Sequence, residues 1–166
     1  MNKNPNSVYT VRFNDCDLFG HLNNARYIDY FLNAREDHLK EYHNLNLSEY
    51  YKKDIAWLVG GHEIAYLRPA LYNEVVTIQT TLLIADNEFL YLEAIMMNEK
   101  QNHLKAIMRT KFIPINTKTG RKEQHLPEFM EWAKTIENSE IDKQGNLEQR
   151  IKQITAEYKI KETIKV

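Results

Sequence analysis

The residues best suited to chemistry lie in one short stretch, residues 12–30, which reads RFNDCDLFGHLNNARYIDY. It brings two carboxylates, one imidazole and two carboxamides close together: Asp15, Asp17, His21, Asn23 and Asn24. A helical pattern begins directly after them, so free backbone N–H groups and the positive end of the helix dipole would lie nearby. A helix start of this kind stabilises a bound anion or a developing oxyanion. A carboxylate beside it can act on a carbonyl as nucleophile or general base.

The same residue types also suit a solvent-exposed turn, because Asn and Asp side chains favour turns and helix N-termini. Cys16 lies between Asp15 and Asp17. A helix N-terminus lowers the pKa of a thiol, whereas two flanking carboxylates raise it. We therefore expect Cys16 to be a small buried residue and not a nucleophile. Residue types alone leave a structural turn and a catalytic site both open.

A longer pattern is more specific. Residues 17–27, DLFGHLNNARY, open a long helix after a first strand and resemble the hot-dog-fold acyl thioesterases. Residues 15–17 are similar to the 4-hydroxybenzoyl-CoA thioesterase branch, and residues 21–27 to long-chain acyl-CoA thioesterases and plant acyl-carrier-protein thioesterases. Residues 66–69 and the turn at 71–74 resemble the end of that family's second strand. The resemblance covers about residues 7–135.

This resemblance implies that Asp17 is the catalytic carboxylate, which attacks the thioester carbonyl or activates a water. The backbone N–H near Asn24 would polarise the thioester oxygen. His21 and Asn23 would hold the water, the carboxylate or the pantetheine arm, while Asp15 is expected to bond within the loop. The implied activity is hydrolysis of an acyl-CoA to a free carboxylic acid and CoA, without a metal or cofactor.

Other functions remain open at this stage. An acyl-carrier-protein thioesterase would use the same motif, because CoA and carrier protein present the same phosphopantetheine arm. A non-catalytic protein that binds acyl thioesters without cleaving them could carry the same motif. Lys105, Arg109 and Lys111 alternate along one predicted strand, so they share a face. Arg109 and Lys111 are candidates for binding the CoA phosphates, with a solvated sheet face as the alternative.

The element that must carry the motif is a helix over residues 24–43, with Asn23 or Asn24 as its N-cap. Its predicted apolar face is made of Ile28, Phe31, Leu32, Leu39 and Tyr42. Its predicted polar face is made of Asp29, Asn33, Glu36 and Lys40. A helix of this length is expected at the centre of a small fold.

Strands are predicted at residues 7–13, 62–68, 74–85, 89–98 and 103–113, the last three as an antiparallel meander. The fold class is therefore α+β, one antiparallel sheet with a helix against one face. Under the family resemblance, the sheet wraps around one long central helix in a hot-dog domain over residues 1–135. Residues 136–166 form a C-terminal helical extension, expected to complete the fold or to bind a partner. Its apolar stripe is Leu147, Ile151, Ile154 and Tyr158.

Composition limits the remaining functions. The 166 residues carry 22 basic and 23 acidic side chains, a balance that favours neither nucleic acid nor a membrane surface as partner. No apolar stretch approaches the roughly 20 residues that a membrane span needs. One cysteine rules out an internal disulfide. We expect a soluble, cytoplasmic protein, and the resemblance adds a homodimer or homotetramer with a role in fatty acid metabolism.

Overall fold

The structure is a computed structural model that describes the backbone of residues 1–164 and the side chains of residues 1–158. Five strands form one antiparallel sheet in the order β1-β3-β4-β5-β2. They are β1 (Asn6–Thr10), β2 (Ile55–Tyr66), β3 (Val75–Ala85), β4 (Leu90–Asn98) and β5 (Leu104–Asn116). The α+β class and the β3-β4-β5 meander are confirmed. The strand that is apolar on both faces, β4, lies at the centre of the sheet.

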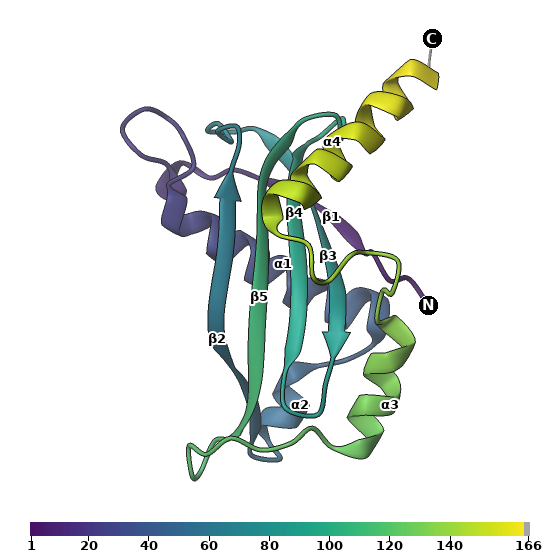
Figure 1. Cartoon of the computed structure of the whole chain (residues 1–166). Helices are drawn as coiled ribbons and strands as arrows, with labels where there is room; N and C mark the ends of the chain where they lie inside the picture. Colours follow the sequence, from purple (N-terminus) through teal and green to yellow (C-terminus); the bar gives the residue numbers. More distant parts are fainter. Residues whose placement is uncertain (165–166) are drawn as a thin grey trace.

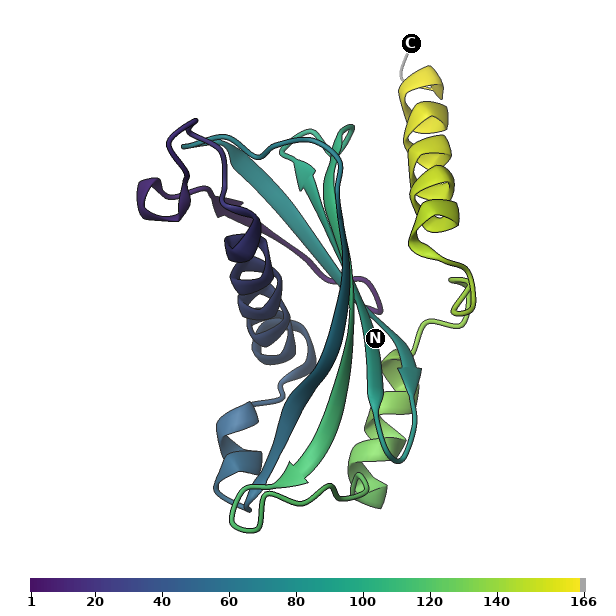
Figure 2. The ribbon, with the colours of Figure 1, turned by 60° about the vertical axis from the view of Figure 1, so that its left-hand side comes forward.

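Helix α1 (Asn24–His43) packs against one face of the sheet, here called the inner face, and the predicted bounds of this helix are confirmed. Helix α4 (Leu147–Ile164) lies on the opposite, outer face (Figures 1 and 2). Asn23 is the N-cap of α1, because its side chain accepts a hydrogen bond from the Ala25 N–H at 3.0 Å. The helix ends at His43, and the next residue, Asn44, has a φ of 50°, the left-handed conformation typical of a helix C-terminus.

The buried side of α1 differs from the predicted apolar face. Phe31 and His38 are fully buried, whereas Tyr42 is 41% exposed. The buried His38 imidazole is hydrogen-bonded through both ring nitrogens. Nδ1 lies 2.7 Å from Thr80 Oγ1, and Nε2 lies 3.0 Å from Ser7 Oγ. A count of apolar residues misses such a position, because a buried polar group is tolerated once it is hydrogen-bonded.

Strand β2 is longer than predicted, since it begins at Ile55 and not at residue 62. Gly60 and Gly61 lie in its interior, and the pairing with β5 shifts register between Val59 and Gly61. A Cβ on Gly60 would come within 2.7 Å of Ile113 Cδ1. Glycine is unfavourable inside strands unless close packing or a bulge requires it. The two adjacent glycines therefore kept the sequence pattern from predicting the first half of β2. The short helix α2 (Leu47–Tyr51) was not predicted.

Helix α3 (Pro127–Ile136) starts with a proline, which suits a first turn because its missing N–H has no acceptor there. Its side chains Phe129, Ala133 and Ile136 are buried in a cluster that includes Leu39 near the end of α1 and Leu92 of β4. This helix therefore closes the core at the end of the sheet distant from the start of α1 (Figure 2).

Helix α4 is fixed to the outer face by apolar packing and by charge. Leu147 and Ile154 are buried against Ile95 and Ile107 of the sheet, which confirms the predicted apolar stripe as a packing surface. Beneath the helix, Glu93 binds the Nε atom of Arg109 at 3.1 Å and the Nε atom of Arg150 at 2.9 Å. Within residues 1–164, no helix is long and apolar enough to cross a membrane.

Candidate functional site

Asp17 caps a tight turn that precedes α1. Its carboxylate Oδ1 accepts hydrogen bonds from the N–H groups of Phe19 at 2.9 Å and His21 at 3.1 Å. Its own N–H donates to the His21 carbonyl at 2.8 Å, and Gly20 turns the chain with a φ of 72°. The carboxylate is therefore held through one oxygen. Within the part of the chain whose side chains are described, Oδ2 accepts no hydrogen bond, and Asp17 is exposed.

The turn is supported from behind by the segment after β2. The Leu22 N–H donates to the Ala70 carbonyl at 2.8 Å, and the Tyr72 N–H donates to the Gly20 carbonyl at 2.8 Å. The buried Tyr27 hydroxyl accepts from the Ala70 N–H at 3.0 Å. Residues 66–74, which carried the second part of the sequence resemblance, thus form the support of the Asp17 turn.

Lys105 anchors this support and is not on a solvated face. Its ammonium donates to the Pro69 carbonyl at 2.9 Å and forms an ion pair with Glu74 Oε1 at 2.7 Å. Glu74 Oε2 in turn accepts from the Leu71 N–H at 2.8 Å. Lys105 therefore acts on the site by positioning the turn that holds it.

Asp15 is bound within the loop, as expected. Its Oδ2 accepts from the Tyr30 hydroxyl at 2.8 Å, and that hydroxyl accepts from the Arg12 N–H at 3.1 Å. Its backbone carbonyl accepts from the Asn23 N–H at 2.9 Å. Burial, together with the hydrogen bond to Asp15, raises the pKa of Tyr30. Asp15 Oδ1 lies 3.9 Å from Arg26 Nε, so this carboxylate is bound by other side chains, whereas the Asp17 carboxylate accepts hydrogen bonds from backbone N–H groups alone.

The start of α1 completes the site. As the first helical residue, Asn24 has an N–H with no acceptor inside the helix. The Tyr66 hydroxyl donates to the Asn24 carbonyl at 2.8 Å and so fixes this turn of backbone. The half-buried His21 imidazole makes no hydrogen bond among the side chains that the structure describes. One loop and one helix start thus bring Asp17, His21, Asn23 and Asn24 together.

Cys16 is half-buried, so the expectation of a buried residue was wrong. Its thiol donates to the Arg12 carbonyl at 3.3 Å. Burial raises the pKa of this thiol, and Asp15 and Asp17 raise it further, which is the direction expected from their charge. Over the described residues, no group of three or more His, Cys, Asp or Glu side chains is arranged to hold a metal ion.

The two basic residues expected to meet the CoA phosphates lie away from this loop. Arg109 is 2% exposed beneath the segment that leads into α4, and it donates to the Gly145 carbonyl at 2.6 Å as well as to Glu93. The sheet face that looked open in the sequence is covered here by α4 and the segment before it, and Arg109 is engaged in holding that segment. Lys111 is exposed on the same outer face, with its ammonium 4.5 Å from the Phe89 ring centre.

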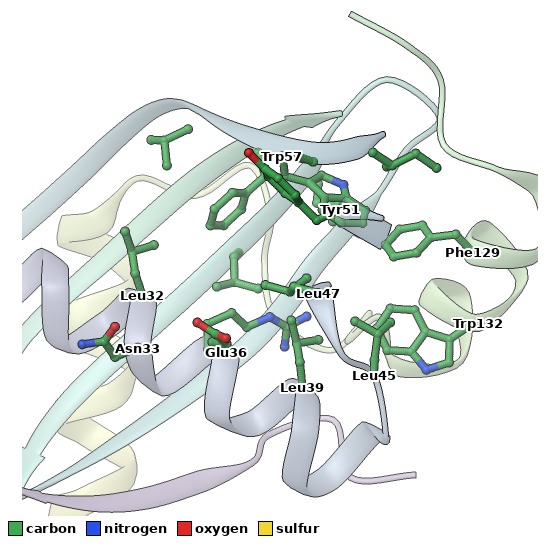
Figure 3. A pocket seen from close by; sticks show the side chains of 17 residues that line it. Leu32, Asn33, Glu36, Leu39, Leu45, Leu47, Tyr51, Trp57, Phe129 and Trp132 are labelled. Carbon is green, nitrogen blue, oxygen red and sulfur yellow. The ribbon is translucent and has the colours of Figure 1, made fainter. Parts of the chain in front are cut away.

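Sequence reasoning missed a cavity of about 410 Å³ between α1 and the inner face. Its walls are mostly apolar and aromatic, with Trp57 of β2 on one side and Leu39 of α1 opposite (Figure 3). Phe129 and Trp132 of α3 close one end. The volume falls in the range of small-molecule pockets. The aromatic residues come from three distant segments, so no local pattern could have predicted them.

Known proteins show the same fold and a related sequence. Residues 11–133 match the family model of the thioesterase-like superfamily. The chain is 28% identical over 134 residues to a 1,4-dihydroxy-2-naphthoyl-CoA hydrolase of Rippkaea orientalis, covering 79% of this chain and 96% of that protein. It is 28% identical over 111 residues to the long-chain acyl-CoA thioesterase FadM of Escherichia coli, covering 67% and 83%. A DHNA-CoA thioesterase from Staphylococcus aureus superposes with a TM-score of 0.75 at 19% identity, covering 80% and 90%.

Proposed function

The chain belongs to the thioesterase-like superfamily and is a thioester hydrolase, and from this premise we propose that it cleaves an acyl-CoA to CoA and a free carboxylic acid. Both sequence relatives act, by their names, on CoA thioesters, one with an aromatic and one with a long-chain acyl group. The shared ligand is CoA, whereas the acyl groups differ. The proposal therefore specifies CoA as the thiol part of the substrate and allows either an aromatic or a long-chain acyl group.

The observation that carries the proposal is the Asp17 carboxylate, held through Oδ1 and free at Oδ2, beside the start of α1. A new C–O bond forms at the thioester carbonyl carbon, and the C–S bond breaks as CoA leaves as thiolate and takes up a proton. Negative charge develops on the carbonyl oxygen before that bond breaks. The Asn24 N–H and the helix dipole would stabilise this charge.

Asp17 can make the C–O bond in two ways. It either attacks the carbonyl itself, giving an anhydride that water then opens, or removes a proton from an attacking water. In the second case His21, whose imidazole is uncommitted, would help to hold that water. Asn23 serves as the helix cap and thereby positions the Asn24 N–H. A single turnover in heavy-oxygen water tests this: water that opens the anhydride at the Asp17 carbonyl carbon leaves its label in Asp17, whereas general-base catalysis leaves it only in the released acid, so a labelled Asp17 identifies direct attack.

We also propose that a second copy of the chain completes the site, in a homodimer or homotetramer. Strand β2 is an edge of the sheet, and unpaired strand edges readily pair with another chain. Leu18 and Phe19, next to Asp17, are 102% and 83% exposed, which is unusual for large apolar side chains. Sedimentation equilibrium tests this assembly. A cytoplasmic location and a role in fatty acid metabolism remain proposals of the same kind.

The test is CoA release from a panel of short, medium, long and aromatic acyl-CoAs. We expect turnover that is highest for one class of acyl group. Activity on an acyl-carrier protein alone, with CoA thioesters inert, would replace CoA by carrier protein as the substrate. Acyl-CoA binding by a folded protein without turnover on either kind of substrate would contradict hydrolysis and favour a binding role.

A further inference from the structure

Arg35 is a buried cation without a partner. It projects from α1 into the wall of the 410 Å³ cavity and is 8% exposed. Among the side chains that the structure describes, its guanidinium forms no ion pair and no hydrogen bond. Burial lowers the pKa of Arg35 to about 10, which still leaves the group charged at neutral pH. A guanidinium has five N–H donors, and none of them has an acceptor among the described residues.

The groups around Arg35 do not neutralise it. Glu36, which also lines the cavity, is engaged with Lys40 at 2.8 Å. His38 and His43 both have pKa values lowered to about 4, first by burial and then by the charge of Arg35, so both are neutral. A buried charge needs a counter-charge or several hydrogen bonds to be stable. The surroundings of Arg35 supply neither.

The rest of the cavity indicates what kind of ligand would fit beside Arg35. The lining is dominated by leucine, tryptophan and phenylalanine side chains (Figure 3). Such walls bind an alkyl chain or an aromatic ring, but a purely apolar ligand would displace the water that still reaches the Arg35 nitrogen atoms and would offer them no partner. A ligand with an apolar body and one anionic end satisfies both parts of the cavity, because arginine binds carboxylates with two parallel hydrogen bonds.

We propose that this cavity binds the acyl portion of the substrate and that Arg35 recognises an anionic group on it, a carboxylate or an acidic aromatic hydroxyl. This proposal rests on the proposed function and specifies its substrate class. Arg35 lies eleven residues after Asn24, about 16 Å along the helix axis. The anionic group is therefore at the end of the acyl portion distant from the thioester. Arg35 is in this account a specificity-determining residue.

The chain carries its own probe for this site. Both of its tryptophans, Trp57 and Trp132, line the cavity, so their fluorescence reports occupancy directly. The ligands are two matched pairs: dodecanoate with dodecanol, and para-butylbenzoate with para-butylbenzyl alcohol. Each pair differs by one anionic group. One pair has an alkyl body and the other an aromatic body. The carboxylate that binds more tightly therefore shows which kind of acyl group fits the cavity.

The variants are Arg35→Met, which keeps the length and removes the charge, and Arg35→Lys, which keeps the charge. Arg121→Met removes an exposed arginine outside the cavity and is the matched control. In the wild type we expect the carboxylate of one pair to bind at least about tenfold more tightly than its alcohol. Arg35→Met should abolish that preference, Arg35→Lys should restore part of it, and Arg121→Met should retain it.

Three results would overturn the proposal. One is equal binding of carboxylate and alcohol by the wild type. Another is an equal loss of both ligands in Arg35→Met with no recovery in Arg35→Lys, which would mark Arg35 as structural. The third is no binding of any probe, which would mean that the cavity is filled, for example by a second copy of the chain. Because none of these readouts requires turnover, a failed proposal here is distinguishable from absent hydrolysis.

Discussion

Buried arginines lie on both sides of the sheet, and their surroundings on the two sides are opposite. On the outer face, Arg109 is bound to Glu93 and to the Gly145 carbonyl, and Arg150 binds the other oxygen of the same carboxylate. On the inner face, Arg35 is bound to nothing among the described side chains and lines a cavity. The first arrangement fastens a helix to the sheet. The second leaves charge available for a ligand.

The contrast shows how burial alone misleads. Arg35 and Arg109 are both less than a tenth exposed, yet only the arginine with satisfied donors contributes to holding the fold. Arg35 in the inner-face cavity and Oδ2 of Asp17 both lack a hydrogen-bond partner among the described residues, and both belong to the proposed site. Removing the charge of Glu93 on the outer face and of Arg35 on the inner face should therefore shift stability in opposite directions.

The largest effect is expected for Glu93→Gln. Loss of this carboxylate charge leaves two buried guanidinium groups without a counter-ion, so the free energy of unfolding should fall by about 3–5 kcal/mol. Urea denaturation measures this fall. The matched control is Glu148→Gln. Glu148 forms an exposed ion pair with Lys152 within α4, so its loss should change stability by about 0.5 kcal/mol or less. Equal effects of the two variants would remove the structural role assigned to the Glu93 cluster.

A smaller effect is expected from acid on the inner face. The pKa values of His38 and His43 fall from 6.5 in the unfolded chain to about 4 in the fold, so the unfolded chain binds more protons in between. The associated stability is complete above about pH 6.5 and is lost as pH falls toward 4. The loss is on the order of 3 kcal/mol per histidine. His43→Phe should make the pH dependence of urea denaturation shallower, and an unchanged slope would contradict these pKa shifts.

Arg35→Met should act in the opposite sense to Glu93→Gln. Replacing an unpaired buried charge with an apolar side chain should raise the free energy of unfolding of the ligand-free protein by about 1–2 kcal/mol. Its measurement is urea denaturation of the variant and the wild type at neutral pH. A loss of more than about 1 kcal/mol would mean that Arg35 has a counter-ion in the assembled protein, and the proposed ligand contact would fall with it.

The sequence allowed the helix carrying the site to be predicted with its bounds, because Asn23 is a strong N-cap and the motif marks its start. It also allowed the meander to be predicted, because the segments that form β3, β4 and β5 are apolar or alternate in polarity and are joined by short connectors. Arg35 was out of reach, because its neighbours Asn33, Glu36 and Asp37 give it the appearance of a solvated residue. Arg109 was misinterpreted for the converse reason: only the distant α4 turns an exposed face into a buried one.

The most direct test of the central claim compares Asp17→Asn with Asp15→Asn in CoA release from the best acyl-CoA of the panel. Both variants remove one carboxylate from the same loop, but Asp15 is bound to the Tyr30 hydroxyl and pairs with Arg26, whereas Asp17 is exposed beside the start of α1. We predict that kcat falls by about a thousandfold or more in Asp17→Asn, and by about tenfold at most in Asp15→Asn, with both proteins folded. Full activity of folded Asp17→Asn would contradict the account.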